Sequence, residues 1–377
     1  MRILTLNYEH PPLGGGGGRL SAKVAAGLVR RGHAVRILTG GMPHLPAEAV
    51  EEGVEVRRLR SGRRREDTCS VPEMAAWVAR AIPAAIAETR RWRPDVIHAH
   101  FAVPTGAVAW ALCKATGIPY VLTAHLGDVP GGVPEQTGDL FRWVKPLTDP
   151  IWRDAAATTA VSSFVAGLAR DAYGIYPEVI LNGITLPASR GITPAEVPRL
   201  LFVGRMSVQK DPVTVVRALS LLKDRPWSCV MIGEGPLMPS VREEISRSGL
   251  EGRIELRGWV SSEGVASAMR EADILLIPSF SEGLPMVAVE ALAHGLAIAG
   301  SRIGGLADVL EEGVTGEAFD LMSGPRGFAV ALDSLLTAPR RLADVRGRCL
   351  ERARRFDLEP SLTAYADVLG KASGKFR

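Results

Sequence analysis

The fold is decided by residues 274–295, which read Ile-Leu-Leu-Ile-Pro-Ser-Phe-Ser-Glu-Gly-Leu-Pro-Met-Val-Ala-Val-Glu-Ala-Leu-Ala-His-Gly. The four apolar residues 274–277 end at a proline and a polar turn, a pattern typical of a buried parallel strand. A helix is expected to follow, because Pro285 suits a first helical position and Gly295 suits the stop after the last turn. The residues between them are apolar on every side, so a core helix is predicted.

Two glutamates accompany this helix, Glu282 in the turn before it and Glu290 within it. An isolated carboxylate on an apolar helix is costly unless a partner or ligand hydroxyls satisfy it. One interpretation is a structural ion pair with an arginine elsewhere in the chain. The other is that both carboxylates line a ligand cleft at the carboxyl end of a parallel sheet, where open α/β folds place their ligands.

The phrase Ser281-Glu282-Gly283-Leu284-Pro285, followed by Glu290-Ala291, Gly295 and Gly304-Gly305, resembles the signature of the retaining glycosyltransferases of family 4. That family carries two glutamates separated by seven residues in this strand, turn and helix context. The resemblance implies transfer of a sugar from a nucleotide diphosphate sugar, such as a UDP- or GDP-sugar, to an acceptor hydroxyl. The acceptor would be a glycan, a lipid or a small molecule, and the reaction would need no cofactor and no metal.

Size and composition agree with a globular enzyme of two domains. The chain has 377 residues, of which 46% are hydrophobic and 23% charged, and its net charge of +4 is too slight to indicate nucleic-acid binding. No apolar run approaches the roughly 20 residues of a membrane span, and Met1 leads almost directly into a strand, so the cytoplasm is the expected location. The four cysteines lack the spacing of zinc or redox sites, so reduced buried thiols are expected.

Arginines are concentrated in two groups, six within residues 57–65 and three within residues 90–93. One interpretation is a solvated arginine-rich loop. The other is contact with anionic lipid headgroups at the inner membrane surface, which would suit the members of the family that glycosylate lipids.

Strand and helix patterns alternate through both halves of the chain. This alternation predicts two doubly wound, Rossmann-like α/β domains with mostly parallel sheets, and the resemblance implies that they face each other across a cleft in the GT-B architecture. We expect an acceptor-side domain at residues 1–187 and a nucleotide-sugar-binding domain at 188–355, joined by a linker at 185–198. A terminal helix within 356–377 is expected to cross back to the first domain.

Five consecutive glycines, Gly14 to Gly18, lie between the first strand and a helix expected at residues 20–31. Their backbone can approach a ligand closely, and the helix that follows favours an anion at its N-terminus. A dinucleotide fold fits poorly, because the second strand ends in Thr39-Gly40-Gly41 and not in an acid for a ribose. A flexible loop is the alternative. The resemblance implies that the loop faces the donor, which it would bind through Gly16, Gly17 and Gly18.

His125 follows a strand predicted at residues 120–123. The resemblance implies that it meets a hydroxyl of the donor sugar as a catalytic residue, whereas a histidine bonded only within its own loop is the alternative. The family often has glycine, any residue and aspartate after this histidine, an order that this chain breaks, so the placement of Asp128 is left open. We interpret His98 and His100 as packing and loop residues.

Arg205 ends the first strand of the second half, and Lys210 follows five residues later. A planar guanidinium and a compact ammonium at strand ends suit a clamp on a diphosphate, and a solvated basic loop is the alternative. The resemblance implies that both residues bind the donor diphosphate and assist catalysis. It also implies nucleotide contacts at Gly233 and Glu234.

The resemblance assigns different parts of the donor to the two glutamates. Glu282, with Gly283, Leu284 and Pro285 around it, would hold the sugar, and Glu290 would hold the ribose. Glu282→Gln is therefore expected to slow transfer and to leave the affinity for free nucleoside diphosphate nearly unchanged. Two alternatives stay open: an epimerase, which would process its nucleotide sugar without an acceptor, and a non-catalytic binder, which would leave it intact.

Overall fold

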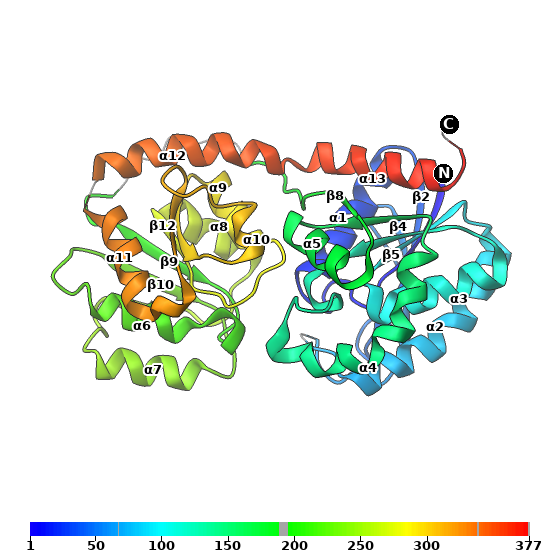
Figure 1. The fold of residues 1–377 in the computed structure, drawn as a ribbon, viewed down its shortest axis with the longest axis horizontal. Coiled ribbons are helices and arrows are strands. Elements are labelled where there is room, and N and C mark those ends of the chain that lie inside the picture. Colours follow the sequence, from blue (N-terminus) through cyan, green and yellow to red (C-terminus); the bar gives the residue numbers. More distant parts are fainter. Residues whose placement is uncertain (67, 188–194, 338, 376–377) are drawn as a thin grey trace. The chain divides into compact units, whose positions relative to one another are not determined.

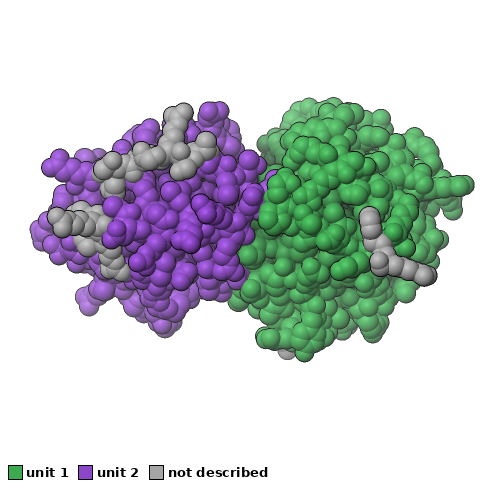
Figure 2. All heavy atoms as spheres, turned by 90° about the horizontal axis from the view of Figure 1, so that it is seen from above, with its two compact units in different colours: residues 1–182, 359–377 green, residues 183–358 purple. Residues whose placement is uncertain are grey.

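The chain folds into two α/β units in the computed structural model, which describes residues 1–66, 68–187, 195–337 and 339–375. Unit 1 comprises Met1–Asn182 and Glu359–Arg377, and unit 2 comprises Gly183–Leu358 (Figure 2). The expected domain boundaries stay predictions, because residues 188–194 of the expected linker lie outside the described part.

Unit 1 is built on a single eight-stranded sheet. Its strands are β1 (Arg2–Leu6), β2 (Ala34–Gly41), β3 (Glu48–Glu51), β4 (Val54–Arg60), β5 (Val96–His100), β6 (Tyr120–Ala124), β7 (Ala157–Ala160) and β8 (Glu178–Val179). Their order is β3-β4-β2-β1-β5-β6-β7-β8, and only the β3–β4 pair at the edge is antiparallel. The interior strand β6 is wholly buried, which fits its largely apolar sequence.

Helices flank this sheet and connect its strands (Figure 1). They are α1 (Gly16–Arg30), α2 (Val71–Trp92), α3 (Ala107–Thr116), α4 (Pro134–Arg153), α5 (Ser163–Tyr173) and α13 (Leu358–Ala372), with the short turns η1 (Ala102–Gly106) and η2 (Leu126–Asp128). The terminal helix α13 lies against α1, since a Cβ atom on Gly27 would lie 2.4 Å from the Leu362 side chain. Arg31 also donates a 2.7 Å hydrogen bond to the carboxylate of Glu359.

Unit 2 is built on a six-stranded parallel sheet in the order β11-β10-β9-β12-β13-β14. Its strands are β9 (Arg199–Val203), β10 (Ser228–Ile232), β11 (Ile254–Leu256), β12 (Ile274–Ile277), β13 (Ala297–Ser301) and β14 (Gly316–Phe319). Its helices are α6 (Pro212–Ser220), α7 (Met238–Arg247), α8 (Ser262–Glu271), α9 (Met286–Ala293), α10 (Gly304–Ala307), α11 (Gly324–Leu336) and α12 (Pro339–Ala353), with the turns η3 (Val208–Lys210), η4 (Leu321–Ser323) and η5 (Arg354–Phe356).

The segment at 274–295 forms the centre of unit 2, as predicted. β12 is buried at all four residues and pairs with β9 on one side and β13 on the other. Gly295 follows α9 with φ +75°, a left-handed conformation that suits glycine after a helix. The prediction for Pro285 is wrong by one position, because it precedes the first helical residue as the N-cap.

Two further predictions differ from the structure. The first helix begins at Gly16, four residues before the predicted start, so the glycines 16–18 form its first turn. A glycine run has low helix propensity, but its missing side chains admit neighbouring residues at close range. The helix α4 was not expected, because Pro146 and Pro150 lie inside it and prolines usually end helices.

Candidate active site

Lys210 and Glu282 lie in direct contact in unit 2. Lys210 Nζ is 2.5 Å from Glu282 Oε1, and the hydroxyl of Ser279 donates to the same oxygen at 2.7 Å. The Glu282 side chain is only 8% exposed and that of Lys210 is 23% exposed, so this ion pair is largely withdrawn from water. Glu282 therefore has a structural partner, as the first interpretation expected, but the partner is a lysine predicted to bind ligand and not an arginine elsewhere.

Gln209 attaches the loop that carries Lys210 to the turn that carries Glu282. Its backbone carbonyl accepts a 2.8 Å hydrogen bond from the N–H of Phe280, and its side-chain amide donates a 3.0 Å bond to the carbonyl of Ser281. The two segments are 72 positions apart in sequence, yet they form one surface at the carboxyl ends of β9 and β12.

A glycine allows two backbone segments of unit 2 to approach each other closely at the turn that carries Glu282. A Cβ atom on Gly305 would lie 2.0 Å from the carbonyl oxygen of Glu282 and 2.3 Å from that of Gly283. No side chain fits at that position, since real Cβ contacts stay beyond about 3 Å. The turn after β12 is thus supported by the start of α10.

The predicted nucleotide contacts lie at the ends of the neighbouring strands. Gly233 has φ +137°, and a Cβ atom on it would lie 1.9 Å from the carbonyl oxygen of Gly204. The N–H of Met206 donates a 2.9 Å bond to the carbonyl of Glu234. The loops after β9 and β10 are therefore joined at the same edge of the sheet as Glu282.

Arg205 and Glu290 complete the predicted set in unit 2. Arg205 is exposed directly after β9, whereas Glu290 is half-buried on α9. Leu284 and Pro285 are buried between Glu282 and that helix. The residues predicted in unit 2 other than Glu290 thus lie on loops at the carboxyl ends of its strands, and Glu290 lies in the middle of α9. Their roles toward a ligand stay predictions.

His125 lies at the carboxyl end of β6 in unit 1, among aromatic rings. Its ring stacks on Phe101 with a centroid distance of 4.2 Å, and its Nε2 is 3.3 Å from Nδ1 of His100. Burial lowers the pKa of His125 to about 3, so the imidazole is neutral near pH 7. A Cβ atom on Gly17 would lie 3.2 Å from His125 Nδ1, which places the predicted glycine loop beside this histidine.

Asp128 holds the backbone around His125. Its carboxylate accepts a 2.8 Å hydrogen bond from the N–H of His125 and a second bond from the N–H of Ala102. Burial raises the pKa of Asp128 to about 7, against the lowering effect of these two donors. The aspartate is therefore a support for the histidine loop, at the position that the sequence left open.

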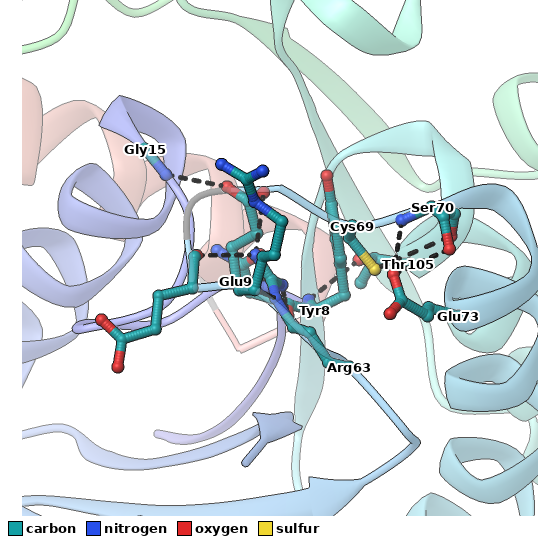
Figure 3. A network of polar contacts seen from close by, with 11 residues as sticks. Tyr8, Glu9, Gly15, Arg63, Cys69, Ser70, Glu73 and Thr105 are labelled. Carbon is teal, nitrogen blue, oxygen red and sulfur yellow. Dashed lines mark hydrogen bonds and ion pairs between the residues drawn. The ribbon is translucent and has the colours of Figure 1, made fainter. Parts of the chain in front are cut away.

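The start of the glycine run is held by polar contacts, one of which is drawn in Figure 3. The N–H of Gly14 donates to the carbonyl of Glu66 at 2.7 Å. The N–H of Gly15 donates to the carboxylate of Glu9 at 3.2 Å, and Figure 3 shows this contact. Gly17 cannot carry a side chain without a clash, because its Cβ would lie 2.4 Å from the ring of Phe101. A flexible loop, the alternative considered above, does not describe these contacts.

Arg63 was predicted to be solvated or to face lipid, and both interpretations are wrong for it. Its side chain is 2% exposed, and its guanidinium donates to the carbonyl oxygens of Arg65, Glu66 and Tyr8 at 2.9, 3.0 and 3.4 Å. Figure 3 shows this arginine among Tyr8, Glu9 and the start of α1. Arg63 is a structural support for the glycine run.

Arg58 is a second arginine that departs from the prediction. Its side chain is 4% exposed and forms an ion pair with Glu51. A group of arginines in sequence therefore does not form a continuous basic surface, although Arg64 and Arg65 are exposed.

Three residues of the two sites were missed or misjudged from the sequence. Ser279 and Gln209 carry no motif of their own, and only the contact between two distant loops reveals them. His100 was interpreted as a packing residue, and it is indeed buried, but it also contacts the ring of His125. The two-residue spacing of His98 and His100 along β5 was a signal, since it puts both side chains on one face of the sheet and pairs His100 with Thr123 near the end of β6.

The described ranges are residues 1–66, 68–187, 195–337 and 339–375. Within these ranges, no group of three or more His, Cys, Asp or Glu side chains is arranged to hold a metal ion. Nor does any helix in the described part of the chain combine the length and apolar character that crossing a bilayer requires.

Comparison with known proteins identifies both units. Residues 14–186 match the model of Glycosyltransferase Family 4, and residues 197–338 match that of Glycosyl transferases group 1. The chain is 28% identical to the D-inositol 3-phosphate glycosyltransferase of Rhodococcus erythropolis, an alignment that covers 99% of this chain and 91% of the relative.

Solved structures share the fold over almost the whole chain. The sucrose-phosphate synthase of Thermosynechococcus elongatus superposes with a TM-score of 0.85 at 20% identity, covering 98% of each chain. HepE of Anabaena, solved in complex with UDP-glucose, superposes with a TM-score of 0.77 at 19% identity, covering 98% of this chain and 100% of HepE. The chain therefore belongs to glycosyltransferase family 4, the group 1 glycosyl transferases, and has the GT-B fold.

Proposed function

We propose that this glycosyltransferase moves a sugar from a nucleotide diphosphate sugar, with a UDP- or GDP-sugar as the first candidates, to an acceptor hydroxyl with retention of anomeric configuration. The observation that carries the proposal is the contact of Lys210 and Ser279 with Glu282 at the carboxyl ends of β9 and β12. One cation and one carboxylate side by side offer a diphosphate and a set of sugar hydroxyls neighbouring binding groups. HepE, a protein of the same fold, was solved with UDP-glucose.

Each residue has a role in the proposed reaction. The bond between the sugar C1 and the diphosphate oxygen breaks, and Lys210 and Arg205 stabilise the negative charge that grows on the leaving group. Glu282 accepts hydrogen bonds from sugar hydroxyls, and Glu290 accepts them from the ribose. His125, neutral and fixed by Phe101, contacts a further sugar hydroxyl.

The acceptor oxygen attacks C1 on the face from which the diphosphate departs. Its proton passes to an oxygen of that diphosphate, so the reaction needs no base from the protein and the products are the glycoside and the nucleoside diphosphate. Retention follows from this common face. We expect no divalent ion to be needed, because Lys210 and Arg205 supply the positive charge.

A donor panel tests this proposal and separates it from its alternatives. The protein is incubated with UDP-, GDP- and ADP-sugars, with and without simple acceptors, and with EDTA in a parallel series. A transferase releases nucleoside diphosphate and a sugar whose anomeric form matches the donor. An epimerase converts a donor without an acceptor, a binder leaves every donor intact, and activity that EDTA abolishes and Mg²⁺ restores contradicts metal independence.

The acceptor belongs to the same proposal. The relative in Rhodococcus is named for a phosphorylated cyclitol, so small polyols join glycans and lipids among the acceptors to be tried. Location in the cytoplasm, and contact with anionic membrane through the exposed Arg64 and Arg65, stay predictions.

A further inference from the structure

Lys210 and Glu282 bind each other. Each residue therefore competes with a ligand group for the other residue. The carboxylate is shared between the Lys210 ammonium at 2.5 Å and the Ser279 hydroxyl at 2.7 Å, both on the same oxygen. An anion that binds Lys210 competes with Glu282 for the same ammonium, and a close contact with the anion moves that ammonium away from the carboxylate. The carboxylate, 8% exposed, would then keep a neutral hydroxyl as its hydrogen-bond donor and lose its countercharge. A buried charge without its partner is strongly unfavourable.

Two ligands of the proposed function differ in how they replace this ion pair. An intact nucleotide sugar offers a new partner to both residues, a diphosphate to Lys210 and hydroxyl donors to Glu282. A free nucleoside diphosphate offers a partner to Lys210 but none to Glu282. The free nucleotide would leave Glu282 buried and charged. The cost of separating the ion pair would therefore reduce the binding free energy of this ligand.

We propose that the Lys210–Glu282 ion pair is a specificity element that makes unit 2 bind an intact nucleotide diphosphate sugar in preference to the free nucleoside diphosphate. This inference rests on the proposed function. It also gives the pair a part in product release. Once the sugar has left for the acceptor, Glu282 has lost its hydroxyl donors and attracts Lys210 back, which weakens the hold on the departing diphosphate.

The test is Glu282→Gln, with binding of the matching nucleoside diphosphate measured by calorimetry. The amide keeps the shape of the side chain but no longer competes for the ammonium of Lys210. The free nucleoside diphosphate should therefore bind about 10-fold more tightly, which corresponds to about 1.4 kcal/mol. The intact nucleotide sugar should bind no more tightly than before, so the preference for it over the free product should shrink. The sequence alone led to a different expectation, namely an unchanged affinity for the free product.

Two further variants isolate the ion pair, and two more serve as controls. Lys210→Met should weaken binding of the free product, and Glu282→Gln added to Lys210→Met should bring no gain, because there is no ammonium left to release. Glu290→Gln, outside the pair, should weaken both ligands to the same extent. Glu282→Asp, which keeps the charge but shortens the side chain by one methylene, should give a smaller gain and serves if the glutamine variant melts far below the wild type.

Different results would contradict the role of the ion pair and the proposed function. If the wild type transfers sugar while both Glu282 variants bind the free product no better than it does, the ion pair does not set the preference and the inference is wrong. The same holds if the gain persists in the Lys210→Met background. If the wild type binds none of UDP, GDP, ADP or their sugars, the proposed function fails, and the inference falls with it.

Discussion

His100 Nδ1 lies 3.3 Å from Nε2 of His125, and both imidazoles are buried. Burial holds the pKa values of both rings well below their usual range, so neither carries a charge near pH 7. One neutral ring must therefore donate a hydrogen to the other, and this contact restrains the ring of His125 from the side opposite Gly17. Under the proposed function, His100 would therefore act on a sugar ligand only through His125.

The first prediction compares two amides in place of His100. An asparagine amide nitrogen takes the position of Nδ1 and can keep the contact with His125, whereas a glutamine amide lies where Nε2 was. His100→Gln should therefore lower kcat about 10-fold, the equivalent of one hydrogen bond of about 1.4 kcal/mol, while His100→Asn should retain most of it. Steady-state kinetics and melting curves of both variants check this. Equal losses of kcat in the two variants would argue for a purely structural role.

The second prediction concerns the pH dependence of stability. Burial lowers the pKa of His98 to about 3, so the folded protein keeps it neutral while the unfolded chain protonates it below about pH 6.5. The unfolded state thus binds more protons between these values, and stability contributed by this group is lost as the pH falls through that window. Asp128, whose pKa is raised to about 7, changes stability in the opposite direction.

A single variant separates the histidine effect from that of Asp128. In the wild type the hydroxyl of Thr123 lies 2.8 Å from His98 Nε2. His98→Gln keeps an amide beside this hydroxyl and removes the titrating imidazole. The stability difference between wild type and variant should change by about 2 kcal/mol between pH 7 and pH 5, in favour of the variant at pH 5. Urea unfolding at the two pH values measures it. A difference that is the same at both values would mean that His98 takes up its proton as readily in the folded protein as in the unfolded chain.

The third prediction concerns two neighbouring arginines with opposite environments. Arg63→Met removes the donors to three backbone carbonyls, of which that of Tyr8 is in a buried hydrogen bond, and should destabilise the protein by about 3 kcal/mol. The glycine run at the start of α1 should lose its support as well, so the rate of transfer should fall. Arg64→Met, at an exposed position, is the matched control and should melt within about 1 °C of the wild type. Similar melting temperatures for the two variants would refute the structural role of Arg63.

The sequence was most informative where local pattern and tertiary position agree. The apolar run 274–277 and the turn at Glu282 predict a central strand followed by a core helix, and the structure has both at those positions. These predictions need no knowledge of distant contacts, because an apolar strand between turn residues is buried whichever strands it pairs with. The two-domain α/β class followed from the alternation of such segments and is confirmed.

What the sequence could not predict depends on contacts between distant segments. No pattern around Lys210 indicates that it meets Glu282, because the contact arises from two loops held together by Gln209. Arg63 looks like a surface residue beside five other arginines, and only the carbonyls around it explain its burial. Clustering of charge along a sequence therefore says little about which charges share a surface.

The connectivity of the two units has a consequence for biosynthesis. The chain enters unit 2 after Asn182 and leaves it before Glu359, so unit 2 is one continuous segment inserted into unit 1. A ribosome delivers every residue of unit 2 before it delivers helix α13, and until then the place of Leu362 beside Gly27 on α1 is uncovered. The unit that starts first is thus completed last. A premature stop codon just after Leu358 would leave unit 2 with all its residues and unit 1 with an open apolar face.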